Sequence, residues 1–235
     1  LYTGGHGRYG NTTFLGALLA MHGEYGSYEA YCTSALASVI YNWEEGFNPY
    51  QTWVSAKGGS HMGWSYGAAY RDVNPYLFWK SAANETWCED WRTENAYFWI
   101  YGIRGDGTFP PISDAGTTAY ANDASAICLI SAALGNSYAA DFVDKEGLGS
   151  AGYEYIWRVI YLNGHDTEIN YDEISTLDKA REFGNSGFVI AKDKWNDQDT
   201  TQLVFKCSSF HSRAHHHKDQ NSISLHYKGP LLIDS

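Results

Sequence analysis

Several features are scarce or missing in this chain of 235 residues. It contains no run of about 18 apolar residues, so the sequence predicts no membrane span. No basic segment followed by an apolar run marks a signal peptide. Basic residues number only 16 against 27 acidic ones, which gives a formal net charge of −11. This balance argues against nucleic acids and anionic membranes as partners.

Cysteine is also sparse, with four residues in the whole chain. They are widely spaced and form no Cys-x-x-Cys pair, so neither a zinc ribbon nor a redox motif is predicted. We interpret them as small buried hydrophobic residues rather than as disulfide partners. The four positions are Cys32, Cys88, Cys128 and Cys207.

Aromatic residues, by contrast, are abundant. The chain has 19 Tyr, nine Trp and ten Phe, and most of the tryptophans fall between Trp43 and Trp99. Apolar faces of sugars stack on such rings, so a carbohydrate cleft is one interpretation. A core of packed helices is the other, because large rings on helices usually face inward.

Helical periodicity extends from Thr12 to about Leu162, where apolar residues repeat every three or four positions. A helix is predicted to begin near Thr117 or Thr118, and a short one to cover Gly152–Tyr161. Antiparallel helices joined by short loops follow, as in a bundle or an α/α toroid. Glycine-containing breaks are predicted at residues 23–27, 46–49, 58–63, 105–116 and 135–137.

The period changes in the last part of the chain, where short apolar or alternating runs are bounded by Gly, Asn, Asp and Pro. They predict an antiparallel sheet. A helical block followed by a sheet block implies two domains, so we expect an α+β protein. Its α/α toroid part would cover residues 1–170, and the start of an antiparallel β-sandwich residues 171–235. The predicted strands are Phe188–Ile190, Gln202–Phe205, Ile223–Tyr227 and Leu231–Ile233.

Both ends of the chain look cut. The sequence opens at Leu1 without an initiator Met, and it closes on an apolar run with no later segment to pair with. We therefore expect an internal fragment of a longer chain.

A histidine-rich stretch lies before the third of these strands. In an extended segment His215 and His217 point to one face and His216 to the other. Across a hairpin near Lys228, His217 could meet Asp234, and imidazole with carboxylate is a ligand set suited to zinc. Two ligands do not close such a site, so a third would come from elsewhere. The alternative is a solvated histidine-rich loop.

Two segments here resemble the heparinase II/III family of polysaccharide lyases. Residues 215–219 match a His-x-His-x-Asp stretch that precedes a strand, and residues 229–235 match a Gly-Pro-Leu segment that ends in Ile-Asp. The resemblance implies that His215 is catalytic. It also implies that His217 and Asp234 bind a structural zinc ion.

The resemblance extends to two segments near the start of the chain. The Gly-Gly-His-Gly stretch around His6 looks like the segment that binds the substrate carboxylate. The loop 58–67 looks like the one that presents the catalytic tyrosine, with Tyr66 in that position. The family loop often has Glu where this chain has Met62, so Tyr70 is the alternative.

The chemistry that the resemblance implies is β-elimination from a uronate. This reaction needs neutralisation of the C6 carboxylate, a base for the C5 proton and an acid for the departing O4. His6 is assigned to the carboxylate, Tyr66 to proton transfer, and His215 to the base for the opposite epimer. Arginine suits carboxylate or sulfate because its guanidinium group can donate hydrogen bonds to two oxygens at once. The predicted substrate contacts are Arg8, His61 and Arg213, with Arg71 and Arg104 as further candidates.

The resemblance therefore implies a periplasmic or secreted polysaccharide lyase acting on heparin, heparan sulfate or a related glycosaminoglycan. An alginate lyase of the same superfamily is an alternative, as is a non-catalytic carbohydrate-binding module. A glycoside hydrolase would need two carboxylates flanking the bond, and no acidic pair stands out. The oligomeric state stays open, with a homodimer as one alternative.

Overall fold

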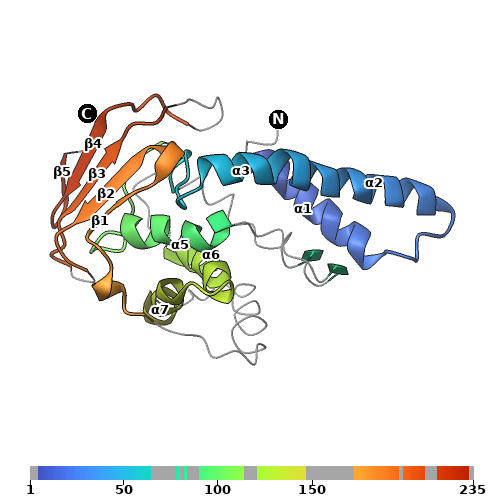
Figure 1. Cartoon of the computed structure of the whole chain (residues 1–235), viewed down its shortest axis with the longest axis horizontal. Coiled ribbons are helices and arrows are strands. Elements are labelled where there is room, and N and C mark those ends of the chain that lie inside the picture. The colour runs from blue at the N-terminus through green and yellow to red at the C-terminus, as the bar shows by residue number, and fades with distance from the viewer. Residues whose placement is uncertain are drawn as a thin grey trace.

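The computed structural model shows helices first and then a five-stranded antiparallel sheet (Figure 1). This confirms an α+β arrangement in the part of the chain that it describes. The expected domain junction between residues 170 and 171 lies outside that part. The described residues are 5–64, 78–79, 82–83, 90–113, 121–146, 172–195, 198–209 and 216–232, with only the backbone described for 5–12, 90, 121–123, 125–126 and 146.

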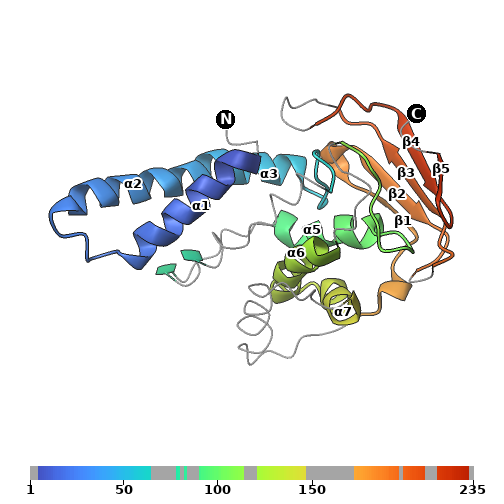
Figure 2. The same ribbon diagram turned by 180° about the vertical axis from the view of Figure 1, so that it is seen from behind.

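Two helices form an arm that extends away from the sheet. Helix α1 (Gly5–Ala20) and helix α2 (Glu29–Tyr41) lie side by side in both views (Figures 1 and 2). The predicted break at 23–27 is confirmed as the turn between them. Buried residues of the arm include Leu15, Leu18, Leu36 and Val39.

The start of α1 differs from the prediction. The sequence predicted a loop around His6 before a helix that begins near Thr12, whereas α1 begins at Gly5. Glycine lowers helix propensity by about 1 kcal/mol without forbidding helical angles. Extending an existing helix also costs less than nucleating one, so the apolar run after Thr12 can carry the helix back to Gly5.

The predicted break at residues 46–49 is wrong. Helix α2 continues through a π-helical turn, η2 (Asn42–Phe47), into α3 (Asn48–Val54). Pro49 lies in the first turn of α3, where a missing backbone N–H costs little. The wide π turn before it accommodates the proline ring without ending the helix.

Three further helices pack together beside the sheet: α5 (Asp90–Gly102), α6 (Ala121–Ala133) and α7 (Ser137–Glu146). The sequence predicted helical structure in the region of α7 without assigning a separate helix there. The first turn of α7 is capped by the Asn136 side chain, which accepts a hydrogen bond from the Ala139 N–H at 3.0 Å. The predicted helix start near Thr117 and the predicted helix at 152–161 lie outside the described residues. Within those residues, no helix is both long enough and apolar enough to cross a bilayer.

The sheet is a meander in which each strand pairs antiparallel with the next. All four predicted strands are confirmed, three of them to within one residue at each end, while β2 runs two residues beyond its predicted end at Ile190. The first strand was not predicted, because its sequence Ala-Arg-Glu lacks β-branched and aromatic residues. The strands are β1 (Ala180–Glu182), β2 (Phe188–Lys192), β3 (Gln202–Lys206), β4 (Ser222–His226) and β5 (Pro230–Leu232).

Helices α5 to α7 and the inner face of the sheet share one hydrophobic core. Trp64 stacks on Phe98 of α5 with ring centroids 4.5 Å apart, and it contacts Phe188 of β2 edge-on at 5.5 Å. Val204 on β3 belongs to the same buried cluster. The helical and sheet layers are therefore packed directly on one another.

The C-terminal end of α5 points at the sheet, whose side chains bind its free carbonyl groups. The Lys192 ammonium group donates to the carbonyl oxygens of Ile100 at 3.1 Å and Ile103 at 2.6 Å. The Gln202 amide donates to the Tyr101 carbonyl at 2.8 Å. The last carbonyls of a helix lack partners within the helix and carry partial negative charge, so a buried cation is stabilised there.

We predict that Lys192→Met lowers the free energy of unfolding by about 1–3 kcal/mol, because buried carbonyl groups would lose a charged donor. Urea denaturation of the chain and its variant measures the difference. Lys179→Met is the matched control, since Lys179 is exposed, and it should change stability by about 0.5 kcal/mol or less. Equal effects of the two changes would contradict the capping role.

Candidate active site

A glycine-rich loop over residues 58–64 follows α3 and is buried along its whole length. Gly58 has φ +85°, and a Cβ atom there would collide with the backbone oxygen of Glu94 on α5. The Asn95 side chain donates to the Gly58 carbonyl at 2.6 Å. Glycine is therefore required at this position, and the loop is held directly against α5.

This loop brings His61 to the junction between the helices and the sheet. The His61 ring is fully buried, and its Nε2 atom lies 3.2 Å from the Tyr50 hydroxyl on α3. The same ring meets His216 edge-to-face with centroids 5.5 Å apart. His216 is also buried, and its Nε2 atom lies 3.3 Å from the Ser208 hydroxyl. A helix, a loop and the approach to β4 thus meet at two imidazoles.

A buried lysine lies at the same end of the sheet. Lys206 on β3 has no exposed surface, and its ammonium group donates to the Ser186 carbonyl at 2.6 Å. It also lies 4.5 Å from the centroid of the Phe188 ring, a cation–π distance. The Asp219 carboxylate, which accepts a hydrogen bond from the Ser113 N–H at 3.4 Å, supplies a nearby negative charge.

These surroundings fix the protonation states in the cluster formed by Tyr50, His61, Lys206 and His216. Burial, reinforced by His216 and Lys206, lowers the pKa of His61 to about 3. Burial lowers the pKa of Lys206 to about 8, with the Asp219 charge acting in the opposite direction. Burial also raises the pKa of Tyr50 to about 12. Near neutral pH the cluster therefore holds a neutral imidazole, a protonated phenol and an ammonium cation.

Some of the residues predicted from sequence can be placed and others cannot. His61 is buried, whereas the side chain of His217 is 45% exposed, with its Nδ1 atom 3.9 Å from the Asp219 carboxylate. The alternation of buried His216 and exposed His217 agrees with an extended segment. Predicted residues whose side chains lie outside the described part of the chain are His6, Arg8, Tyr66, Tyr70, Arg71, Arg213, His215 and Asp234.

Arg104, one of the further arginine candidates, is placed at the other end of the inner sheet face. It is buried and donates to the Ser224 hydroxyl at 3.3 Å. Beside it, His226 lies 3.3 Å from the Asp106 carboxylate. Since His226 pairs with Gln202 and Lys206 pairs with Ser222 in the register, this second cluster is separate from the one around His61.

The donor chemistry of the predicted zinc site suits the metal, because imidazole and carboxylate are ordinary zinc ligands. His217 is accessible at the surface. In the described ranges, no group of three or more His, Cys, Asp or Glu side chains is arranged to hold a metal ion. Zinc binding by His217 and Asp234 therefore stays a prediction.

No protein-family model matches this chain, and a search of curated proteins finds no significant match. The resemblance to the heparinase II/III family therefore depends on the motifs quoted from the sequence.

Three members of the cluster had no role in the sequence prediction. Lys206 could have been recognised, because alternation along β3 places it on the same face as buried Val204. For His216, the sequence predicted only that its side chain points to the opposite face from those of His215 and His217. Nothing in the sequence distinguishes Tyr50 among 19 tyrosines.

The buried state of His61 predicts a loss of stability in acid. Above about pH 6.5, the ordinary pKa, the ring is neutral in both folded and unfolded chains. As pH falls from there toward about 3, the unfolded chain binds a proton that folded His61 does not. This proton uptake lowers the free energy of unfolding by up to about 1.4 kcal/mol per pH unit.

We predict that His61→Gln flattens this acid limb, measured as the free energy of unfolding in urea between pH 6.5 and 4. The exposed His22 provides a matched control, and His22→Gln should keep the slope of the unsubstituted chain. An unchanged slope in His61→Gln would show that His61 is not the group responsible.

Proposed function

We propose that this chain belongs to a polysaccharide lyase that cleaves an acidic, uronate-containing polysaccharide by β-elimination where the helices meet the sheet. The observation that carries the proposal is the ring contact between His61 and His216. It joins the loop that runs into the predicted catalytic Tyr66 to the segment that follows the predicted catalytic His215 directly.

The reaction requires no oxidant and no added water. A base removes the C5 proton of the uronate, the C4–O4 bond breaks, and a double bond forms between C4 and C5. An acid protonates O4 as it leaves. Side chains that hold and move protons are therefore sufficient for the bond changes.

The electrostatics of the cluster favour this chemistry. Desolvation keeps the His61 imidazole neutral and the Tyr50 phenol protonated, so His61 can accept a hydrogen bond and Tyr50 can donate one. Lys206 adds a positive charge close enough to act on His61. In a protein with a formal charge of −11, such a local cation helps an anionic sugar to approach.

The catalytic roles follow the sequence prediction. His6 neutralises the carboxylate, and Tyr66 transfers protons as acid and, on one face of the sugar, as base. For the opposite epimer, whose proton and leaving oxygen lie on different faces, His215 takes the proton. His61 is fully buried, so in place of its predicted role as a substrate contact we assign it the role of orienting Tyr50 and His216.

We further propose that the helices are part of an α/α toroid and that the sheet is one layer of a β-sandwich. The support is the outer face of the sheet, where apolar side chains are exposed on strand after strand. A second sheet would cover such a face. These side chains and their exposed fractions are Val189 39%, Leu203 40%, Ile223 37% and Leu232 40%. A polysaccharide substrate also favours a periplasmic or secreted location.

Incubation of the protein with a panel of heparan sulfate, other glycosaminoglycans and alginate tests the function. A lyase leaves an unsaturated uronate that absorbs ultraviolet light. Reducing ends without this absorbance would indicate a hydrolase. Binding of the polysaccharide without either the unsaturated uronate or new reducing ends would indicate a carbohydrate-binding module. Either the hydrolase result or the binding-module result would refute the lyase.

The variant Tyr66→Phe provides the sharpest test of mechanism. With no hydroxyl to protonate O4, turnover should fall by about 10² or more, as positioned proton transfer typically contributes this much. Stability should change by about 1 kcal/mol or less, because one hydroxyl hydrogen bond is lost at most. Initial rates of ultraviolet absorbance measure the effect.

The control for this change is Tyr227→Phe, since Tyr227 is exposed at the sheet end remote from His61. It should keep full activity. Full activity in Tyr66→Phe itself would remove Tyr66 from the mechanism and leave Tyr70 or Tyr50 as the proton donor.

Zinc held by His217 and Asp234 would cross-link two segments at the end of the sheet and so stabilise it. The elimination reaction needs no metal-activated water, so this zinc would be structural. We therefore predict that a chelator lowers the melting temperature of the protein while enzyme kept below that temperature stays active. His217→Ala should lower the melting temperature by a similar amount and abolish its response to the chelator. Immediate loss of activity at an unchanged melting temperature would contradict a structural role.

A further inference from the structure

An exposed tryptophan lies on the helix that carries Tyr50. Trp53 is three residues further along α3, and residues at this spacing share one face of a helix. The side chain of Trp53 is 48% exposed. Tyr50 in turn contacts His61, with the hydroxyl 3.2 Å from the imidazole nitrogen.

Exposure therefore increases from His61 through Tyr50 to Trp53. His61 is fully buried, Tyr50 is half-buried, and Trp53 is open to solvent over nearly half of its surface. A chain of sugars that has one unit at the candidate site would pass over the indole when it extends toward solvent.

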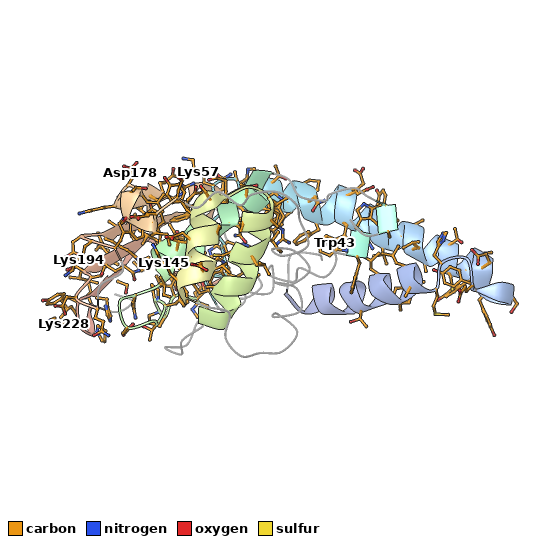
Figure 3. The ribbon with its side chains drawn as sticks, turned by 90° about the horizontal axis from the view of Figure 1, so that it is seen from below. Trp43, Lys57, Lys145, Asp178, Lys194 and Lys228 are labelled. Atoms are coloured by element: carbon orange, nitrogen blue, oxygen red, sulfur yellow. The ribbon has the colours of Figure 1, made fainter. Side chains whose placement is uncertain are left out.

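The backbone beneath Trp53 is anchored to the sheet layer. The Asn185 side chain, in the turn η5 (Gly184–Ser186) before β2, donates to the Trp53 carbonyl at 2.8 Å. Lys57, just after α3, forms an ion pair with Glu182 of β1. Figure 3 shows Lys57 where the end of α3 meets the sheet. The backbone that carries the ring is therefore anchored, which lowers the entropy lost on binding.

Other exposed tyrosines lie further from Tyr50 along the chain and are not on α3. Tyr28 and Tyr31 lie at the outer end of the helical arm, and Tyr41 lies at the last residue of α2. Among the described residues, Trp53 is the exposed large ring on the same helix as Tyr50.

We propose that Trp53 is the stacking platform of a carbohydrate subsite, which binds the sugar next to the uronate that is cleaved. This inference rests on the proposed function. The flat indole face suits the C–H face of a pyranose, while the polar groups of the sugar stay in solvent. The ligand class is an acidic oligosaccharide long enough to reach from the reaction centre to α3.

Calorimetric titration with heparan sulfate hexasaccharides and with alginate hexasaccharides tests the subsite. A Tyr66→Phe background prevents turnover during the measurement. Trp53→Ala should weaken binding of the recognised hexasaccharide about tenfold, as expected for the loss of an aromatic contact. Trp53→Phe should lose less, because a smaller ring remains. Tyr31→Ala, which removes an exposed ring on the arm, should bind like the parent protein.

In the protein with Tyr66 intact, Trp53→Ala should raise KM by about the same factor and leave kcat within about twofold, because the platform touches a non-reacting sugar. Unchanged binding and KM in Trp53→Ala would overturn the subsite even if the protein is a lyase. Binding that depends on Trp53 in a protein without lyase activity would overturn the proposed reaction and keep the subsite. Absence of binding to both hexasaccharides would overturn the subsite. Whether the protein is a lyase is decided separately, by the formation of an unsaturated uronate that absorbs ultraviolet light.

Discussion

The capping of α5 by the sheet determines where the other parts of the molecule lie. Lys192 and Gln202 bind the last carbonyl groups of this helix, so α5 can meet the sheet in only one position along its axis. The next constraint follows from it, because Asn95 of α5 holds Gly58 and so places the loop that carries His61. The geometry of the candidate site therefore depends on hydrogen bonds made at the far end of α5.

The sheet has an unusual distribution of polarity, with lysine, glutamine and histidine buried on the face that meets the helices. Burying such groups is costly unless they find partners, and the helix carbonyls supply partners for Lys192. Lys206 donates to the Ser186 carbonyl, and its charge acts on His61. At one end of the inner face, buried polar side chains thus hold α5 in place. At the other end, buried Lys206 determines the electrostatics of the candidate site.

Sequence reasoning predicted the sheet better than the site. Alternation and turn residues identified four strands, because each depends on local chemistry, whereas β1 has no such signal. Pro49 was read as a helix break because its effect depends on the π turn that precedes it. The site joins segments that are distant in sequence, so the motif around His216 was visible but its contact with His61 was not. The role of Tyr50 depends on that same contact and could not be predicted from its own neighbours.

The wide sequence separation of the two imidazoles has a consequence for folding kinetics. His61 and His216 are about 155 positions apart, and closing so long a loop carries an entropic cost that local contacts avoid. The turn between α1 and α2 and the hairpins of the sheet involve near neighbours and can form early. The ring contact needs both layers to be docked. An intermediate with nearly all of its helices and strands in place would therefore still lack the candidate site.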